Sequence, residues 1–230
     1  MKNIQNPIKI EKDDSFKVIF SKYGAYAFDK QENLANIIED SQGILDLDNG
    51  TLTFNKDIKF NVQILAFYSE EFNRWSWGWD SESLGINDEF INDSKKIKEI
   101  GKEFDIKEFI TPSFEIDFND SHIIAMISSS LLEVDAYYMA SIEDLEVFLT
   151  IRSDLIKEDN SAERFRLTFN NFQKNFDVFK RIAFEGYTKL KGYEFKQKDE
   201  FSLAKIGNDR VIVGFSDRGS ITHIQLLEAD

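Results

Sequence analysis

The sequence has no cysteine, and among its 230 residues it has only two histidines, two prolines and eleven glycines. Without cysteine the chain has no thiol nucleophile, no disulfide and no cysteine-ligated metal. With His122 and His223 as its only histidines, it also lacks the residues for a multi-histidine metal centre. The composition therefore predicts no metal and no cofactor.

Long apolar runs are also missing. No segment reaches the roughly 18 apolar residues of a membrane-spanning helix, and the longest candidate, residues 123–132, is interrupted by three serines. Residues 1–14 lack the basic-then-apolar order of a secretory signal. Together with the absence of cysteine, this predicts a cytoplasmic protein with no membrane partner.

Acidic residues outnumber basic ones by 42 to 28, which gives a formal net charge of −14. Sequence-independent nucleic-acid binding needs a basic surface, so we expect no nucleic-acid partner. The excess is uneven, because residues 1–156 hold 30 acids and 15 bases, whereas residues 157–230 hold 12 and 13. The polar segment 157–161 lies at this change. It predicts a boundary between two domains, 1–156 and 157–230, that pack together.

The apolar periodicity predicts an α+β protein whose helices pack on antiparallel β-meanders. A helical recurrence covers residues 15–40, and an alternating pattern follows it. This alternation predicts strands at residues 44–48, 51–55, 58–68 and 74–81. Asn49-Gly50 predicts a type I′ hairpin turn between the first two.

The middle of the chain mixes both patterns. Helical periodicity predicts helices at residues 88–104 and 120–134, the second apolar on most of its surface. Pro112 favours extended structure around it. The predicted strands are residues 109–118, 136–140 and 145–152.

Phenylalanines recur every three or four residues between Phe165 and Phe179, which predicts one helix over residues 161–187. Four strands follow, at residues 193–198, 201–206, 210–215 and 221–227. A helix followed by a four-strand meander therefore occurs twice. The phenylalanine stripe is interpreted as the face that packs on its own sheet, and a partner interface is the alternative.

The three tryptophans, Trp75, Trp77 and Trp79, occupy alternate positions within five residues. On a strand their indoles share one face, and Gly78 leaves room on the other for a close approach. Two interpretations follow: a core beneath a helix, or an aromatic platform that lines a cleft beside Asp80.

Polar candidates gather near the start of the predicted helix 120–134. Asp117, Asp120 and His122 could hold a divalent cation or orient a general base. The favoured interpretation is a helix N-cap with a polar residue nearby. Tyr137 and Tyr138 follow and are candidates for the same cleft. The chain has no nucleophile elbow, phosphate-binding loop or His-Glu-x-x-His motif.

Several blocks together resemble an uncharacterised bacterial protein family. They are Gln31-Glu32-Asn33-Leu34, residues 63–69, the Trp-x-Trp-Gly-Trp block followed by Asp80, and residues 125–132 followed by Asp135-Ala136-Tyr137-Tyr138. The resemblance covers roughly residues 15–151. Because that family is a domain of unknown function, the resemblance implies no activity.

Two classes of function stay open. The favoured one is a non-enzymatic protein-interaction module, an acidic protein that captures a basic partner as immunity proteins capture toxins. The alternative is a small-molecule binder or hydrolase-like enzyme with a cleft near the tryptophan strand and His122. We assign no catalytic residue. The candidate binding residues are Trp75, Trp77, Trp79, Asp80, Asp117, Asp120, His122, Tyr137 and Tyr138.

Overall fold

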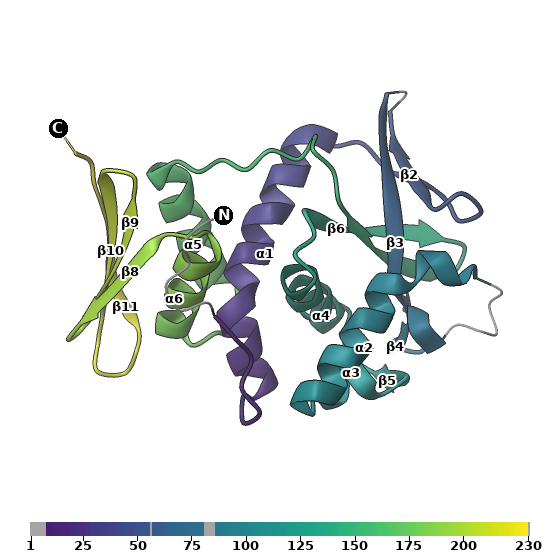
Figure 1. Cartoon of the computed structure of the whole chain (residues 1–230), viewed down its shortest axis with the longest axis horizontal. Coiled ribbons are helices and arrows are strands. Elements are labelled where there is room, and N and C mark those ends of the chain that lie inside the picture. The colour runs from purple at the N-terminus through teal and green to yellow at the C-terminus, as the bar shows by residue number, and fades with distance from the viewer. Residues whose placement is uncertain (1–7, 56, 81–85, 230) are drawn as a thin grey trace. The chain divides into compact units, whose positions relative to one another are not determined.

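A computed structural model describes residues 8–55, 57–80 and 86–229 of the chain, which divides into two compact units. Unit 1 comprises Met1–Asp29 and Glu158–Asp230, and unit 2 comprises Lys30–Lys157. Helix α1 (Phe16–Ile38) contributes to both (Figure 1). One division thus falls at the change in charge near residue 157. Residues 1–29, however, group with the C-terminal segment, because the first half of α1 packs on its phenylalanines.

Unit 2 contains one seven-stranded antiparallel sheet in which β1 to β5 are neighbours in order, while β7 pairs with β3 and β6. The strands are β1 (Ile44–Asp46), β2 (Thr51–Phe54), β3 (Ile58–Ser69), β4 (Arg74–Trp77), β5 (Ser113–Glu115), β6 (Ala136–Ile142) and β7 (Leu145–Ile151). The helices are α2 (Asn92–Phe104), α3 (Lys107–Ile110) and α4 (Phe118–Leu131), with 3₁₀ turns at Gly78–Asp80 and Asp88–Phe90.

From Ile64 to Tyr68 the central strand β3 is buried on both of its faces. On one face Ile64 and Phe67 join a hydrophobic core that includes Leu149 of β7 and Leu34 of α1. The other face carries Tyr68 and the residues paired with it on β4 and β7. The pairing of β3 with β7 is irregular between Ile64 and Ala66, where the register shifts by one residue.

The α+β class with two helix-and-meander arrangements is confirmed, whereas three local predictions for unit 2 are wrong. Strand β4 ends at Trp77, so the strand predicted to residue 81 is shorter, and residue 81 itself lies outside the described residues. The strand predicted at 109–118 is the short helix α3 followed by β5. In the first hairpin Gly50 alone has a positive φ, 59°, because the loop is longer than a two-residue type I′ turn.

A buried carboxylate fixes the first turn of α2 against the sheet. Asp93 is 1% exposed, and it accepts hydrogen bonds from Thr150 (2.6 Å) and, through both oxygens, from Arg152 (2.6 and 3.1 Å). Arg152 also donates to the carbonyl of Leu132 at the end of α4 (3.2 Å). Burial disfavours the charged form, but the Arg152 and Thr150 hydrogen bonds outweigh it and lower the pKa of Asp93.

Replacing Asp93 with asparagine is expected to cost about 1.5–3 kcal/mol of unfolding free energy at neutral pH. The buried hydrogen bonds from Thr150 and Arg152 lose their charged acceptor, while the half-exposed Arg152 side chain stays partly solvated. The extra stability of the wild type should be lost as the pH falls from 3.8 through the lower pKa that Asp93 has in the folded protein, because the Asp93 carboxyl is then protonated. Urea unfolding at a series of pH values measures both effects. As a control, Asp88→Asn breaks only the exposed pair with Lys95 and should cost no more than about 1 kcal/mol. Equal costs for the two variants would contradict the role given to Asp93.

Unit 1 packs the first half of α1 and two helices, α5 (Ala162–Asn175) and α6 (Lys180–Leu190), with a four-stranded antiparallel sheet. The strand order is β11-β10-β9-β8, with β8 (Glu194–Lys198), β9 (Phe201–Ile206), β10 (Asp209–Phe215) and β11 (Ile221–Leu227). In Figure 1, α5 and α6 lie on one side of this sheet.

The single helix predicted over residues 161–187 is wrong, because the chain turns between α5 and α6. Phe176 adopts extended backbone angles, and the amide of Phe179 donates to Ser21 of α1 (2.9 Å). Phe172 and Phe176 then contact Phe20 of α1 edge-on (5.6 and 5.4 Å between ring centroids). The phenylalanine spacing continues across the break, so periodicity alone could not reveal it.

A second buried charge lies in unit 1. Asp29 of α1 pairs with Lys191 (3.0 Å), both side chains being 1% exposed, and with Arg164 (3.2 Å). Burial, together with the nearby charges of Asp29, Glu158 and Asp159, raises the pKa of Tyr193 to about 12. The ion pairs of Asp29 therefore tie α1 to the first turn of α5 and to the C-cap of α6.

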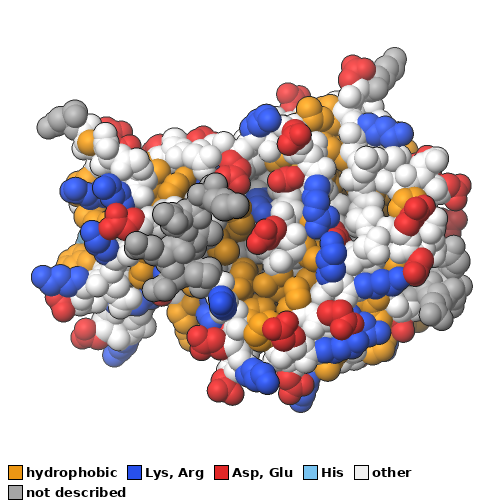
Figure 2. Space-filling view, viewed as in Figure 1, with side chains coloured by type: hydrophobic (Ala, Val, Ile, Leu, Met, Phe, Trp, Pro, Cys, Tyr) orange, Lys and Arg blue, Asp and Glu red, His pale blue; other side chains and the backbone are white. Residues whose placement is uncertain are grey.

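The net charge of the chain resides in unit 2. Residues 30–157 hold 26 acids and 11 bases, a net charge of −15, whereas the residues of unit 1 hold 16 acids and 17 bases. Figure 2 shows Lys and Arg side chains interspersed among Asp and Glu side chains on one face of the molecule. The acidic excess is therefore a property of unit 2, and on the face seen in Figure 2 it is interrupted by Lys and Arg side chains.

At Gly186 the backbones of α6 and α1 come close together, since a Cβ there would lie 2.1 Å from the carbonyl oxygen of Lys22. Alanine usually stabilises a helix by about 1 kcal/mol relative to glycine. We expect Gly186→Ala to destabilise unit 1 instead, by about 1–3 kcal/mol, because backbone must move. Thermal unfolding followed by circular dichroism measures the change. Glu185→Ala on the adjacent, half-exposed position is the control, and a stabilised Gly186→Ala variant would refute this packing.

Candidate functional site

Trp75 and Trp77 lie inside unit 2 and are both 0% exposed. Their rings meet edge-on at 5.2 Å, and Trp75 also contacts Phe148 of β7 at 5.0 Å. The indole N–H of Trp77 donates to the carbonyl of Glu108 (2.8 Å). Trp75 and Trp77 are therefore core residues, as the first of the two interpretations of the tryptophan strand predicts.

Trp79 does not share their face, because it lies in the 3₁₀ turn that follows β4. Its ring is half-buried under the ammonium group of Lys98 on α2, 3.7 Å from the ring centroid, and its backbone N–H donates to Ser94 (3.1 Å). A Cβ at Gly78 would lie 3.0 Å from the Ile64 carbonyl, which makes this turn tight against β3. The expectation of three indoles on one strand face is therefore wrong. Asp80 ends the turn and is exposed.

His122 lies in the first turns of α4 and shares a 3.1 Å hydrogen bond with the hydroxyl of Tyr137 on β6. Phe118 and Phe148 contact its ring edge-on, at 5.0 and 5.2 Å. Burial lowers the pKa of His122 and raises the pKa of Tyr137, so both groups are held neutral. The backbone of Tyr137 is in turn held by both ends of the Gln31 side-chain amide (2.9 and 2.8 Å).

The remaining candidates do not join this pair. Tyr138 points to the opposite face of β6, where its hydroxyl accepts a hydrogen bond from the amide of Gly43 (3.1 Å). Asp117 precedes α4 as its N-cap residue without a side-chain capping bond, and Asp120 lies in the first turn. Both carboxylates are exposed. The structure thus brings His122 and Tyr137 to the Trp75 cluster, but it separates them from Trp79, Asp80 and Tyr138.

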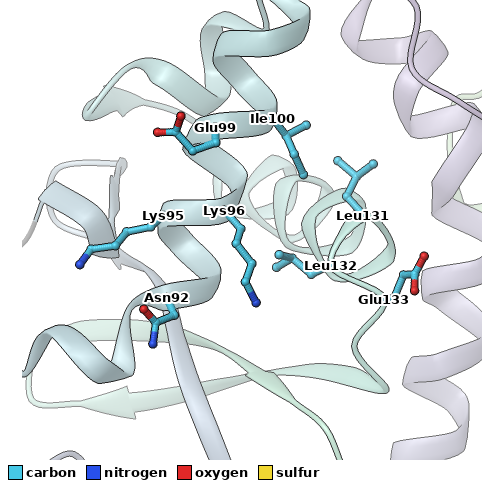
Figure 3. A pocket seen from close by; sticks show the side chains of 8 residues that line it. All are labelled: Asn92, Lys95, Lys96, Glu99, Ile100, Leu131, Leu132 and Glu133. Atoms are coloured by element: carbon cyan, nitrogen blue, oxygen red, sulfur yellow. The ribbon is translucent and has the colours of Figure 1, made fainter.

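A groove of about 740 Å³ lies elsewhere in unit 2, between α2 and the end of α4 (Figure 3). Lys96 points toward it from α2, and Leu131 and Leu132 border it on the α4 side (Figure 3). Its polar lining is Asn92, Lys95, Lys96, Glu99 and Glu133. None of the residues predicted from the sequence lines this groove. Lys95 and Lys96 are already paired with Asp88 and Asp93.

Acidic side chains gather at one end of the seven-stranded sheet. The register pairs Ser69 with both Arg74 and Leu145, and Arg74 with Glu115, so the turns after β3 and β6 and the end of β5 lie together. Residues 69–75, 113–120 and 141–147 hold eight acids and, as their one base, Arg74. We call the eight acids the acidic rim: Glu70, Glu71, Glu115, Asp117, Asp120, Glu143, Asp144 and Glu146.

Seven acids of the rim are exposed, and Glu146 is half-buried beside Ser141. Phe72, between Glu71 and the start of β4, is 63% exposed. Burial, followed by the negative charges of Asp117 and Glu70, raises the pKa of Tyr68 at the end of β3. The rim is therefore an acidic surface with an apolar ring projecting from it. Sequence reasoning included Asp117 and Asp120 but missed Phe72, whose position in an otherwise polar turn was the available signal.

Among the described residues, no group of three or more His, Asp or Glu side chains is arranged to hold a metal ion. Within the same ranges no helix has the length and apolarity needed to cross a membrane.

Replacing His122 with glutamine should change how stability depends on pH. Because burial lowers the pKa of folded His122 below 6.5, the unfolded chain takes up the proton first. Above pH 6.5 His122 is neutral in both the folded and the unfolded chain and has no effect on how stability changes with pH. From pH 6.5 down to the pKa of the folded protein, protonation of His122 in the unfolded chain progressively lowers the free energy of unfolding. Between about pH 7.5 and about pH 5.5, urea unfolding should show a larger loss for the wild type than for His122→Gln. A wild-type loss no larger than that of His122→Gln would rule out this role for burial.

Residues 18–154 match the model of a family of unknown function, DUF6882. The match covers more than half of the chain, which therefore belongs to this family. It spans most of α1 and nearly all of unit 2, including the tryptophan block and the acidic rim. No curated protein and no solved structure matches the chain.

Proposed function

We propose that this member of the DUF6882 family is a non-enzymatic interaction module whose acidic rim binds a basic protein partner. The single observation that carries the proposal is the gathering of eight acids and one base around an exposed Phe72. The rim belongs to the part of the chain that the family model covers. We further propose that the protein works in the cytoplasm of a bacterial cell, which the absence of cysteine permits.

The negative charge of unit 2 and the exposed ring of Phe72 both suit this role. A net charge of −15 on residues 30–157 steers a basic partner toward unit 2, and the effect falls with added salt. Exposed aromatic rings commonly become binding hot spots when a partner buries them. Phe72 would supply that apolar contact, and Glu70 and Glu71 beside it would pair with Lys or Arg side chains. This is the binding mode of an immunity-like protein.

The alternative of a cleft enzyme gains no support from the tryptophans, because Trp75 and Trp77 are in the core. His122 is neutral, paired with Tyr137 and surrounded by aromatic rings. These residues stabilise unit 2 and hold the start of α4 beside the rim.

The test is affinity purification from cells of the native organism, followed by titration of the purified partner. We expect one basic protein to bind the wild type at low salt. Glu70→Lys/Glu71→Lys should weaken its affinity by about tenfold or more, since both charges are reversed. Phe72→Ala should weaken it as well, through a faster dissociation rate.

The matched control is Glu39→Lys/Asp40→Lys, which makes the same charge change at an exposed site of unit 2 after α1. It should slow association slightly through the net charge and leave the dissociation rate unchanged. The proposal fails if no basic protein is recovered, or if the control weakens binding as much as the rim variant does.

A further inference from the structure

The sheet of unit 1 has one face covered by helices and one face open. Ser202, Ala204, Val211 and Val213 point inward and are buried. The alternate residues of all four strands form the opposite face. In Figure 1, α5 and α6 lie on one side of this sheet only.

The register arranges this outer face as three rows that run across the strands. Lys196, Leu203, Ile212 and Gln225 form the middle row. Lys198, Phe201, Gly214 and His223 form one flanking row, and Glu194, Lys205, Arg210 and Leu227 form the other. We call these twelve residues the outer face.

The outer face is basic around an apolar centre. Its bases are Lys196, Lys198, Lys205 and Arg210, all exposed, and its one acid is Glu194, paired with Lys196 at 2.7 Å. Leu203 and Ile212 are half-buried in the middle, whereas Phe201 is 43% exposed. In Figure 2, Lys and Arg side chains lie beside apolar side chains on this sheet, at the left of the view.

An aromatic corner completes the surface. A Cβ at Gly214 would lie 2.3 Å from the His223 ring, so the imidazole lies across this glycine. Phe201 contacts the same ring at 5.7 Å. Gly214 thus lets two rings lie on the outer face next to Lys198.

Edge protection does not account for these charges. Lysines on an edge strand discourage strand pairing, which would explain Lys196 and Lys198 on β8. Lys205 and Arg210, however, lie on β9 and β10, which are paired on both sides. Unit 1 as a whole is nearly neutral, so the concentration of bases on this one face is local.

We propose that the outer face of β8–β11 docks an acidic segment of a partner protein, one that carries apolar side chains between its carboxylates. An apolar centre with a charged rim is the usual anatomy of a protein interface. Four bases against one acid supply charge complementarity to carboxylates. The site is separate from the acidic rim, and the two surfaces select partners of opposite charge.

Other occupants fit less well. A second copy packed face to face would set the four bases against four like charges. A nucleic acid would find aliphatic Leu203 and Ile212 at the centre, where stacking rings are needed. An acidic protein segment with apolar side chains matches both the apolar centre of the outer face and the bases around it.

The experiment uses the full chain and a fluorescein-labelled short peptide of alternating Glu and Leu residues, followed by fluorescence anisotropy. The wild type should bind the peptide, and binding should weaken as salt is raised. Lys198→Glu and Phe201→Ala should each weaken it by about tenfold. The control Lys174→Glu makes the same charge change on α5 and should bind like the wild type. Thermal unfolding of each variant verifies the fold.

An oligodeoxythymidylate of equal length is tested in parallel. Tighter binding of this oligonucleotide than of the peptide would overturn the proposal in favour of nucleic acid. Absence of peptide binding, or equal weakening by Lys174→Glu, would overturn it outright. Protein that sediments as a dimer, with the dimer lost in Lys198→Glu, would assign the face to self-association and overturn it too. None of these measurements involves the acidic rim, so the two proposals fail independently.

Discussion

The double-sided burial of β3 is the constraint on which the rest of unit 2 depends. A strand with water on one face needs an apolar residue only at every second position, but β3 pairs with β2, β4 and β7 and is covered on both faces. Its run from Ile64 to Tyr68 is accordingly buried throughout. One face packs in the hydrophobic core with α1, and the other packs in the aromatic cluster with Trp75. The position of β3 also sets where its turn, and so the acidic rim, lies.

Buried polar contacts then fix the positions of helices that apolar packing alone does not specify. Asp93 with Arg152 and Thr150 sets the first turn of α2, and Arg152 reaches on to the end of α4. In unit 1, Asp29 with Lys191 and Arg164 does the same for α1. Such pairs add little net stability over apolar replacements, but removing one partner is costly, so they specify position. In each unit a buried aspartate thus orients helices, Asp93 in unit 2 and Asp29 in unit 1.

The two proposed surfaces differ in what builds them. The acidic rim is made of turns and strand ends, where side chains are free to project, and its charge follows the −15 of residues 30–157. The outer face of β8–β11 is a sheet surface whose pattern follows from strand alternation. A molecule with one acidic and one basic docking surface would connect two partners of opposite charge.

The sequence by itself determined the α+β class, most strand positions and the unequal charge, because period-two and helical patterns are local properties of the chain. It also correctly placed β9 and β11, whose bounds agree with the alternation. It did not determine that α5 and α6 are separate, since Phe172 and Phe176 keep the helical spacing while serving a contact with α1. Nor did it decide that Trp79 leaves the strand, or that the turns at residues 70 and 143 meet. Those outcomes depend on which segments become neighbours, and only tertiary packing, in which distant residues compete for the same buried space, decides that.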